Sequence, residues 1–155
     1  MATGRASVAK HPIHPMLVVF PLGLWIMALA CDIAEVITGK PMWGTLAFWN
    51  IVGGIIGALA AAVPGFLDYP GVKGRIGRIA TWHMSLNLAA VVLFAVNALV
   101  RSRAGVGSHL PLALSVIGVA GVLVSGWLGG EMVYVERMGV DESSHRRQDR
   151  PRRVA

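Results

Sequence analysis

Four long stretches of this chain contain no Asp, Glu, Lys or Arg, and they occupy residues 16–31, 41–67, 79–100 and 110–130. A helix needs about 20 mostly apolar residues to cross about 30 Å of hydrocarbon. In lipid such a segment has to be helical, because every backbone N–H and C=O needs a partner within the chain. The sequence therefore predicts an all-α protein with spans at about residues 15–37, 46–67, 79–100 and 110–133.

The composition and the short loops extend this prediction. Charged residues make up 14% of the chain and hydrophobic residues 55%, whereas soluble domains average about 25% charged residues. Short connections favour antiparallel neighbours, so we expect a four-helix transmembrane bundle with up-down-up-down topology. The predicted organisation is a flexible arm at 1–9, a membrane domain at 10–138 and a basic, disordered tail at 139–155.

The cationic residues predict how the bundle is oriented. Four spans place both termini on one side of the membrane, and positive residues concentrate in cytoplasmic loops. Lys40, Arg101 and Arg103 fall on the opposite side. The terminus side carries eleven Lys and Arg, namely Arg5, Lys10, Lys73, Arg75, Arg78, Arg137, Arg146, Arg147, Arg150, Arg152 and Arg153. We therefore expect both termini in the cytoplasm and a multi-pass protein of the inner membrane.

Several classes of function have no support in the sequence. The single cysteine, Cys31, excludes a disulfide framework and a cysteine-based zinc site within one chain. A signal peptide is an alternative for the N-terminus, but the apolar stretch continues through Asp32 to Ile37, which favours a span. "GVKGRIG" lacks the ending of a P-loop, and no conventional enzyme signature is present. The basic tail indicates contact with anionic lipid rather than with nucleic acid.

Each predicted span carries polar groups at its terminus-side end. Because consecutive spans alternate in direction, we expect these groups to meet at one membrane level. They lie in "KHPIHPMLVVF", "PGFLDYPG", "TWHMSLN" and "GWLGGEMVYVERMGV", and are His11, His14, Asp68, His83, Glu131 and Tyr134.

A second polar set lies deeper and towards the opposite side. Asp32 follows His14 by five helical turns, so the two share a helix face. Asn87 shares a face with His83, and Asn97 lies further along it. Asp32 and Asn97, together with Asn50 at the outer start of the second span, form a predicted outer polar cluster. Polar groups inside spans generally face a partner or serve a function.

The motifs "HPIHPMLVVFPLGLW", "PGFLDY", "HMSLN" and "GWLGGEMVYVERMGV" together resemble the DUF2231 family of bacterial membrane proteins, over about residues 10–140. The resemblance implies a bacterial inner-membrane domain of about four spans and no established activity. Some relatives resemble fusions to Rieske-type iron–sulfur domains, which implies a redox setting, although this chain has no Rieske cysteines. The family-like positions here are His11, His14, Asp68, His83, Asn87, Gly129, Gly130, Glu131 and Tyr134.

One hypothesis for the histidines is a redox cofactor. Histidines on facing bundle helices can ligate haem iron, and His14 or His11 with His83 is the natural pair for a b-type haem. The alternative ligand is a transition metal held by the three histidines with Asp68 or Glu131, because imidazole and carboxylate suit zinc, iron or copper.

Two other hypotheses stay open. The polar network closes the bundle of a structural anchor or partner subunit, with His14 as a helix cap before Pro15 and His83 bonded to Asp68, Glu131 or a backbone carbonyl. Alternatively, aligned His14 and Asp32 outline a path for protons or small solutes, although the sequence shows no convincing repeat of the kind many carriers have. A redox membrane partner or a homo-oligomer is expected beside the lipid bilayer.

Overall fold

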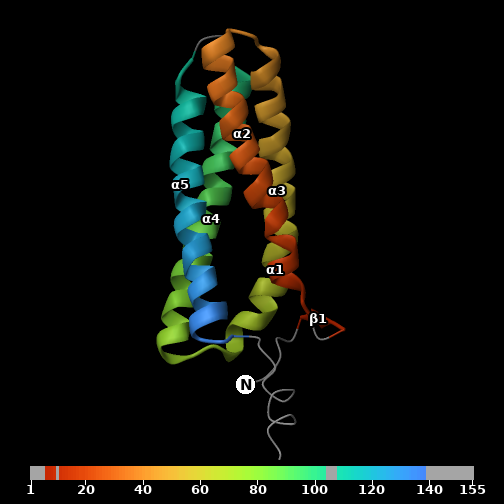
Figure 1. Cartoon of the computed structure of the whole chain (residues 1–155), viewed down its shortest axis with the longest axis vertical. Coiled ribbons are helices and arrows are strands. Elements are labelled where there is room, and N and C mark those ends of the chain that lie inside the picture. Colours follow the sequence, from red (N-terminus) through yellow and green to blue (C-terminus); the bar gives the residue numbers. More distant parts are fainter. Residues whose placement is uncertain (1–5, 10, 104–107, 139–155) are drawn as a thin grey trace, which may run out of the picture.

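The computed structural model describes residues 6–9, 11–103 and 108–138, which form a bundle of four long helical segments (Figure 1). The predicted tail at 139–155 and most of the predicted arm lie outside the described residues. The helical elements are α1 (Ile13–Leu17), α2 (Val19–Thr38), α3 (Met42–Asp68), α4 (Gly74–Arg103), α5 (Leu110–Gly130) and a π-helical turn, η2 (Glu131–Val135). A small hairpin of β1 (Ser7–Val8) and β2 (His11–Pro12) precedes α1, and a 3₁₀ turn, η1 (Tyr69–Gly71), joins α3 to α4.

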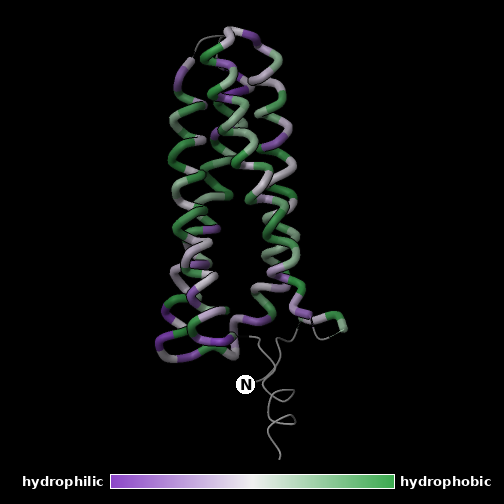
Figure 2. The backbone as a smooth tube through the Cα atoms, in the orientation of Figure 1, coloured by the Kyte–Doolittle hydropathy of each residue, from purple (hydrophilic) through white to green (hydrophobic). Residues whose placement is uncertain are grey.

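The all-α bundle predicted from the sequence is confirmed. Figure 1 shows consecutive segments running in alternate directions, with β1 and the end of η2 at the same end of the bundle. The helices long and apolar enough to cross a membrane are Ile13–Thr38, Met42–Gly71, Gly74–Arg103 and Leu110–Val135. Each is longer than predicted, because the helices continue beyond the charge-free stretches into polar ends, which Figure 2 shows as purple segments.

The outward faces of the bundle are apolar. Ile37, Trp49 and Trp127 expose 77%, 64% and 78% of their surface, and many other large apolar side chains are exposed. Figure 2 shows that the middle of every helix is largely hydrophobic. Such a surface is unusual for a soluble protein, because soluble proteins rarely expose large contiguous apolar patches. The fold is therefore that of a multi-pass membrane protein whose outer surface contacts lipid.

The core centres on a stack of two aromatic rings. Trp25 in α2 and Phe94 in α4 lie with ring centroids 4.3 Å apart and planes inclined by 15°, and both are buried. A Cβ on Gly54 would collide with the Trp25 indole, and one on Gly118 would lie 2.6 Å from Phe94 Cζ. Glycine at these two positions of α3 and α5 therefore makes room for the stack.

The two helical hairpins, α1–α3 and α4–α5, repeat one pattern of contacts. Three pairs of residues meet across the bundle at the same sequence interval: His14 with His83, Trp25 with Phe94, and Asp32 with Arg101. On the partner helices, Gly54 and Gly118 face the aromatic rings and Gly65 and Gly129 face the histidine rings, again at one interval. When two repeats are related by a two-fold axis, equivalent residues of the repeats contact each other only where they lie near that axis. The three pairs therefore indicate that the hairpins are parallel repeats, related by an axis that runs along the bundle.

This parallel repeat differs from the inverted repeats of many carriers, of which the sequence shows no convincing sign. Few of the corresponding residues are identical, since Trp25 corresponds to Phe94, and Asp32 to Arg101. The contact made at each position repeats, but the residue types differ, so a comparison of the two sequence segments does not show the repeat. We call the end of the bundle at His14 and His83 the histidine end, and the end at Asp32 and Arg101 the ion-pair end.

The ion-pair end holds a buried polar network. Arg101 Nη2 lies 2.7 Å from Asp32 Oδ1, and the two side chains expose only 9% and 2% of their surface. The Ser115 hydroxyl donates to Asp32 Oδ2, and Asn97 Nδ2 donates to Ser115 Oγ (2.9 Å) and to a backbone carbonyl of α5 (3.0 Å). The predicted cluster is thus present for Asp32 and Asn97. Asn50, by contrast, donates to Leu46 O in its own helix.

Removing one member of this ion pair should destabilise the bundle. We expect Asp32→Asn or Arg101→Gln to lower the free energy of unfolding by about 3–5 kcal/mol, because each leaves a buried charge without its partner. The measurement is the unfolding transition in detergent micelles, completed as a double-mutant cycle with the variant that carries both changes. Arg103→Gln, an exposed change on the same helix, is the control. Equal stability of the control and of both single variants would contradict a stabilising pair.

Candidate functional site

The two histidines of the "HPIHP" motif have different partners. His11 lies in the N-terminal hairpin, is exposed, and donates from Nδ1 to Ala9 O at 2.9 Å. His14 lies inside α1 and donates from Nδ1 to Ala61 O in α3 at 2.7 Å. The predicted cap before Pro15 is not formed, because Pro12 occupies the N-cap of α1. Only the second histidine of the motif therefore joins the helices of the bundle.

His83 in α4 has an equivalent partner in α5. Its Nδ1 lies 2.8 Å from Ser125 O and 3.0 Å from Ser125 Oγ. Of the three partners predicted for His83, the structure shows the backbone carbonyl and not Asp68 or Glu131. Each ring can approach the neighbouring backbone because a glycine lies one turn further along that helix. A Cβ at Gly65 would lie 3.0 Å from His14 Nδ1, and one at Gly129 would lie 3.2 Å from His83 Cε1.

The two imidazole rings face one another across the axis of the bundle. Their centroids are 6.2 Å apart and their planes are inclined by 83°. A backbone carbonyl can only accept a hydrogen bond, so the Nδ1 atom that contacts it carries the proton in each ring. In the neutral rings Nε2 then keeps its lone pair. The site therefore presents two half-buried imidazoles, each with Nδ1 bonded to a backbone carbonyl and with Nε2 as an acceptor.

Asn87 is the remaining polar side chain at the pair. Its Nδ2 lies 2.8 Å from His83 O, 2.8 Å from Ser125 Oγ and 3.1 Å from His83 Nε2. An amide nitrogen has two hydrogens, and the two shorter contacts satisfy both of them. The third contact places the amide against His83 Nε2, so this nitrogen would have to exchange Asn87 for any other group that it binds.

The structure does not add the predicted carboxylates to the pair. Asp68 accepts the backbone N–H of Ala6 at 3.0 Å and so fixes the start of the N-terminal hairpin. Glu131 binds Arg75 at 3.0 Å, and the same arginine binds Glu136 at 2.8 Å. Within residues 6–9, 11–103 and 108–138, no group of three or more His, Cys, Asp or Glu side chains is arranged to hold a metal ion.

Of the residues predicted to form a metal site, the structure brings His14 and His83 together and leaves His11, Asp68 and Glu131 outside the pair. The physical reason is that the outer residues have nearer partners at the helix ends, a backbone amide or an arginine. Tyr134, predicted to join the network, is 85% exposed on η2.

Some contributors to the site and to the ion-pair end were not predicted. Ser125 is not among the residues singled out in the sequence, yet both of its oxygens contact His83. Arg101 was counted as a loop cation and instead pairs with Asp32. The signal for Arg101 was present, because it follows His83 at the interval at which Asp32 follows His14.

Comparisons with known proteins agree with this architecture. The model of a family described as a predicted membrane protein (DUF2231) matches residues 10–142. Neither a curated protein nor a solved structure matches the chain significantly. The matched segment covers most of the chain and contains all the helices and both facing histidines. The chain therefore belongs to the DUF2231 family of predicted membrane proteins.

Proposed function

We propose that His14 and His83 are a bis-imidazole ligand pair for a transition metal, either the iron of a b-type haem or a single ion, in a small redox-associated membrane domain. The observation that carries the proposal is the equivalent state of the two rings. Each donates Nδ1–H to a backbone carbonyl of the neighbouring helix, and the two rings meet across the bundle with their centroids 6.2 Å apart.

The hydrogen bonds and the spacing fit such a pair. Histidines that bind metals almost always donate their other ring N–H to a carbonyl, a carboxylate or water. A metal bound by one nitrogen of each ring at about 2.0–2.1 Å would separate the ring centres by roughly 6 Å. The observed separation of the centroids is 6.2 Å. Two ligands suffice for a haem, whose macrocycle supplies the other four, whereas a single ion would need further ligands such as water.

The surrounding residues hold this pair in place. The carbonyls of Ala61 and Ser125 fix the orientation of the rings, and Gly65 and Gly129 permit the close approach. The buried Trp25–Phe94 stack lies further along the bundle, towards the ion-pair end. A bound haem or redox-active ion would supply one-electron transfer, and its potential would depend on these ligands and on the burial of the site.

The same stack argues against the transport hypothesis. Trp25 and Phe94 lie on the axis between the histidine pair and Asp32, so an apolar layer interrupts the predicted polar path. Asp32 is also bound by Arg101 and Ser115. A structural anchor or partner subunit is the second candidate, favoured because Nδ1 of each ring already has a partner within the chain.

The buried ion pair also supports the proposed orientation. Arg101 does not act as a loop charge, so the side opposite the termini keeps only Lys40 and Arg103 among the cations of the sequence. The contrast with the terminus side is larger than the sequence count indicated. We therefore place both termini in the cytoplasm of a bacterial cell and the histidine pair at the cytoplasmic side of the inner membrane.

Protein purified from membranes should show the cofactor directly. We expect either a Soret band that shifts on reduction, which assigns haem, or about one equivalent of iron, copper or zinc by elemental analysis without such a band. Whichever signal the wild-type protein shows should be lost in His14→Ala and in His83→Ala, because each variant removes one of the two ligands. His11→Ala and His109→Ala, which change histidines outside the pair, should retain them.

A second variant separates loss of the ligand from loss of the fold. In His83→Gly, added imidazole should restore the absorption band or the bound metal, since the free ring can occupy the vacated space. Protein that contains neither a Soret band nor stoichiometric metal, after growth with supplied haem precursor and metals, would overturn the ligand pair and leave the structural anchor.

The glycines beside the rings give an independent prediction. Gly129→Ala and Gly65→Ala should weaken cofactor affinity by about 10–100-fold, the usual effect of disturbing a group that orients a ligand. The added Cβ would lie 3.2 Å from His83 Cε1 or 3.0 Å from His14 Nδ1 and displace the ring from its carbonyl. Gly126→Ala on α5 is the matched control, since no atom lies within 4 Å of its added Cβ. Affinity is measured by titrating the cofactor into depleted protein, and equal affinities of control and test variants would refute this role.

A further inference from the structure

We propose that the groove between α4 and α5 at the histidine end is a binding site for one anionic phospholipid, with its phosphodiester at Arg78 and an acyl chain between the helices. The groove has a volume of about 710 Å³ and opens on the outer surface of the bundle. It does not contain the histidine pair, so this site is independent of the proposed cofactor.

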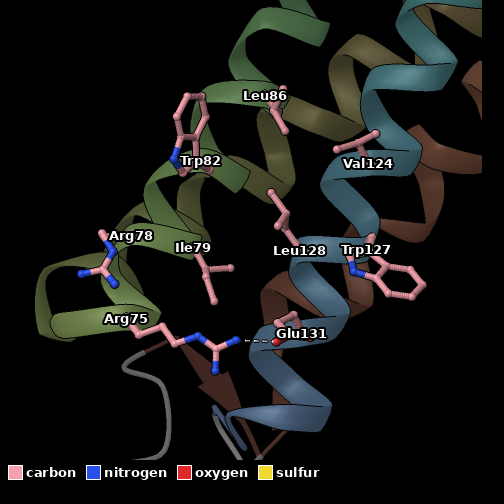
Figure 3. A pocket seen from close by; sticks show the side chains of 9 residues that line it. All are labelled: Arg75, Arg78, Ile79, Trp82, Leu86, Val124, Trp127, Leu128 and Glu131. Carbon is pink, nitrogen blue, oxygen red and sulfur yellow. Dashed lines mark hydrogen bonds and ion pairs between the residues drawn. The ribbon is translucent and has the colours of Figure 1, made fainter.

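The walls of the groove suit an acyl chain. Figure 3 shows Ile79 and Leu86 of α4 and Leu128 and Val124 of α5 around the space between the two helices. From Ile79 to Leu86 the apolar part of the groove follows α4 for roughly 10 Å at 1.5 Å per residue. One leaflet contributes about half of the roughly 30 Å hydrocarbon core of a bilayer. The groove is thus long enough for the part of an acyl chain nearest the headgroup.

Two tryptophans flank the groove. Trp82 of α4 and Trp127 of α5 expose 67% and 78% of their surface, and Figure 3 shows them on opposite sides of it. Exposed indoles near the ends of membrane helices are typical of the boundary between lipid headgroups and acyl chains. Their position places the charged end of the groove at headgroup level.

The charges at this end favour an anion over a neutral headgroup. Arg75 binds the two carboxylates nearby, Glu131 and Glu136, and so bridges α4 and η2. Arg78 is exposed at the same end, and no carboxylate of the described residues pairs with it. Lys73, also exposed, lies shortly before it in the chain. Basic groups between membrane helices on the cytoplasmic side attract anionic lipid headgroups, and a phosphodiester supplies the missing partner for Arg78.

Fluorescence quenching tests this site with a defined lipid. The full chain is titrated in nanodiscs with phosphatidylglycerol brominated on its acyl chains, and in parallel with brominated phosphatidylcholine. We expect stronger quenching by the anionic lipid. Trp82→Phe/Trp127→Phe should abolish this difference, because these two indoles flank the groove.

Variants of the arginine decide the role of its charge. Arg78→Gln should raise the half-quenching fraction of phosphatidylglycerol about fivefold, the effect expected for losing one basic residue near an anionic headgroup. Arg78→Lys should stay near wild type. Arg103→Gln, an exposed change at the far end of the same helix, is the matched control and should have no effect.

Three outcomes would overturn the site. The first is equal quenching by the two lipids, which would indicate an ordinary lipid boundary. The second is unchanged phosphatidylglycerol binding by Arg78→Gln. The third is full competition by millimolar inorganic phosphate, which would indicate a phosphate site without a lipid. Because Arg78 is exposed and lies outside the hydrophobic core, circular dichroism should show that all arginine variants keep the helical fold.

Discussion

A polar group surrounded by lipid needs a partner within the protein, and this requirement determines how the four helices of the chain meet. The imidazole Nδ1–H groups find backbone carbonyls on neighbouring helices, and Asp32 finds Arg101 and Ser115. Each of these contacts joins segments that are far apart in the sequence. The apolar surface outside the bundle fixes none of them, because lipid covers any apolar side chain equally well. The specific arrangement of the helices therefore depends on a small number of buried polar contacts together with glycines that let the backbones and rings approach.

Along the axis these contacts form three successive layers. The histidine pair lies at one end, the Trp25–Phe94 stack in the middle and the Asp32–Arg101 pair at the other end. The middle layer separates the two polar layers, so they act as distinct sites rather than as one path. The histidines are suited to hold a ligand, whereas the ion pair already satisfies its own charges and joins the two hairpins.

The sequence predicted the architecture well because charge-free stretches of this length have one stable solution in lipid. It also predicted that alternation of the spans would bring His14 towards His83, and the two rings are in contact. The carbonyl partners could not be predicted, because every residue has a carbonyl and only the packing decides which one a ring reaches. The partners of Asp68 and Glu131 could not be predicted for a similar reason. They lie on the expected side of the bundle, but a backbone amide and an arginine are nearer to them than the histidines are. Arg101 looked like a loop cation because it follows the last apolar residue of its span.

The repeat of the two hairpins has a consequence for how such halves associate. Residues on the axis meet their own counterparts, so two copies of the first hairpin would bring aspartate against aspartate, and two copies of the second would bring arginine against arginine. Like charges buried in lipid repel strongly, whereas the histidine and aromatic layers tolerate self-pairing. The single position at which the halves carry opposite charges thus discriminates against symmetric assembly. Joining the two halves in one polypeptide keeps the aspartate of one half beside the arginine of the other.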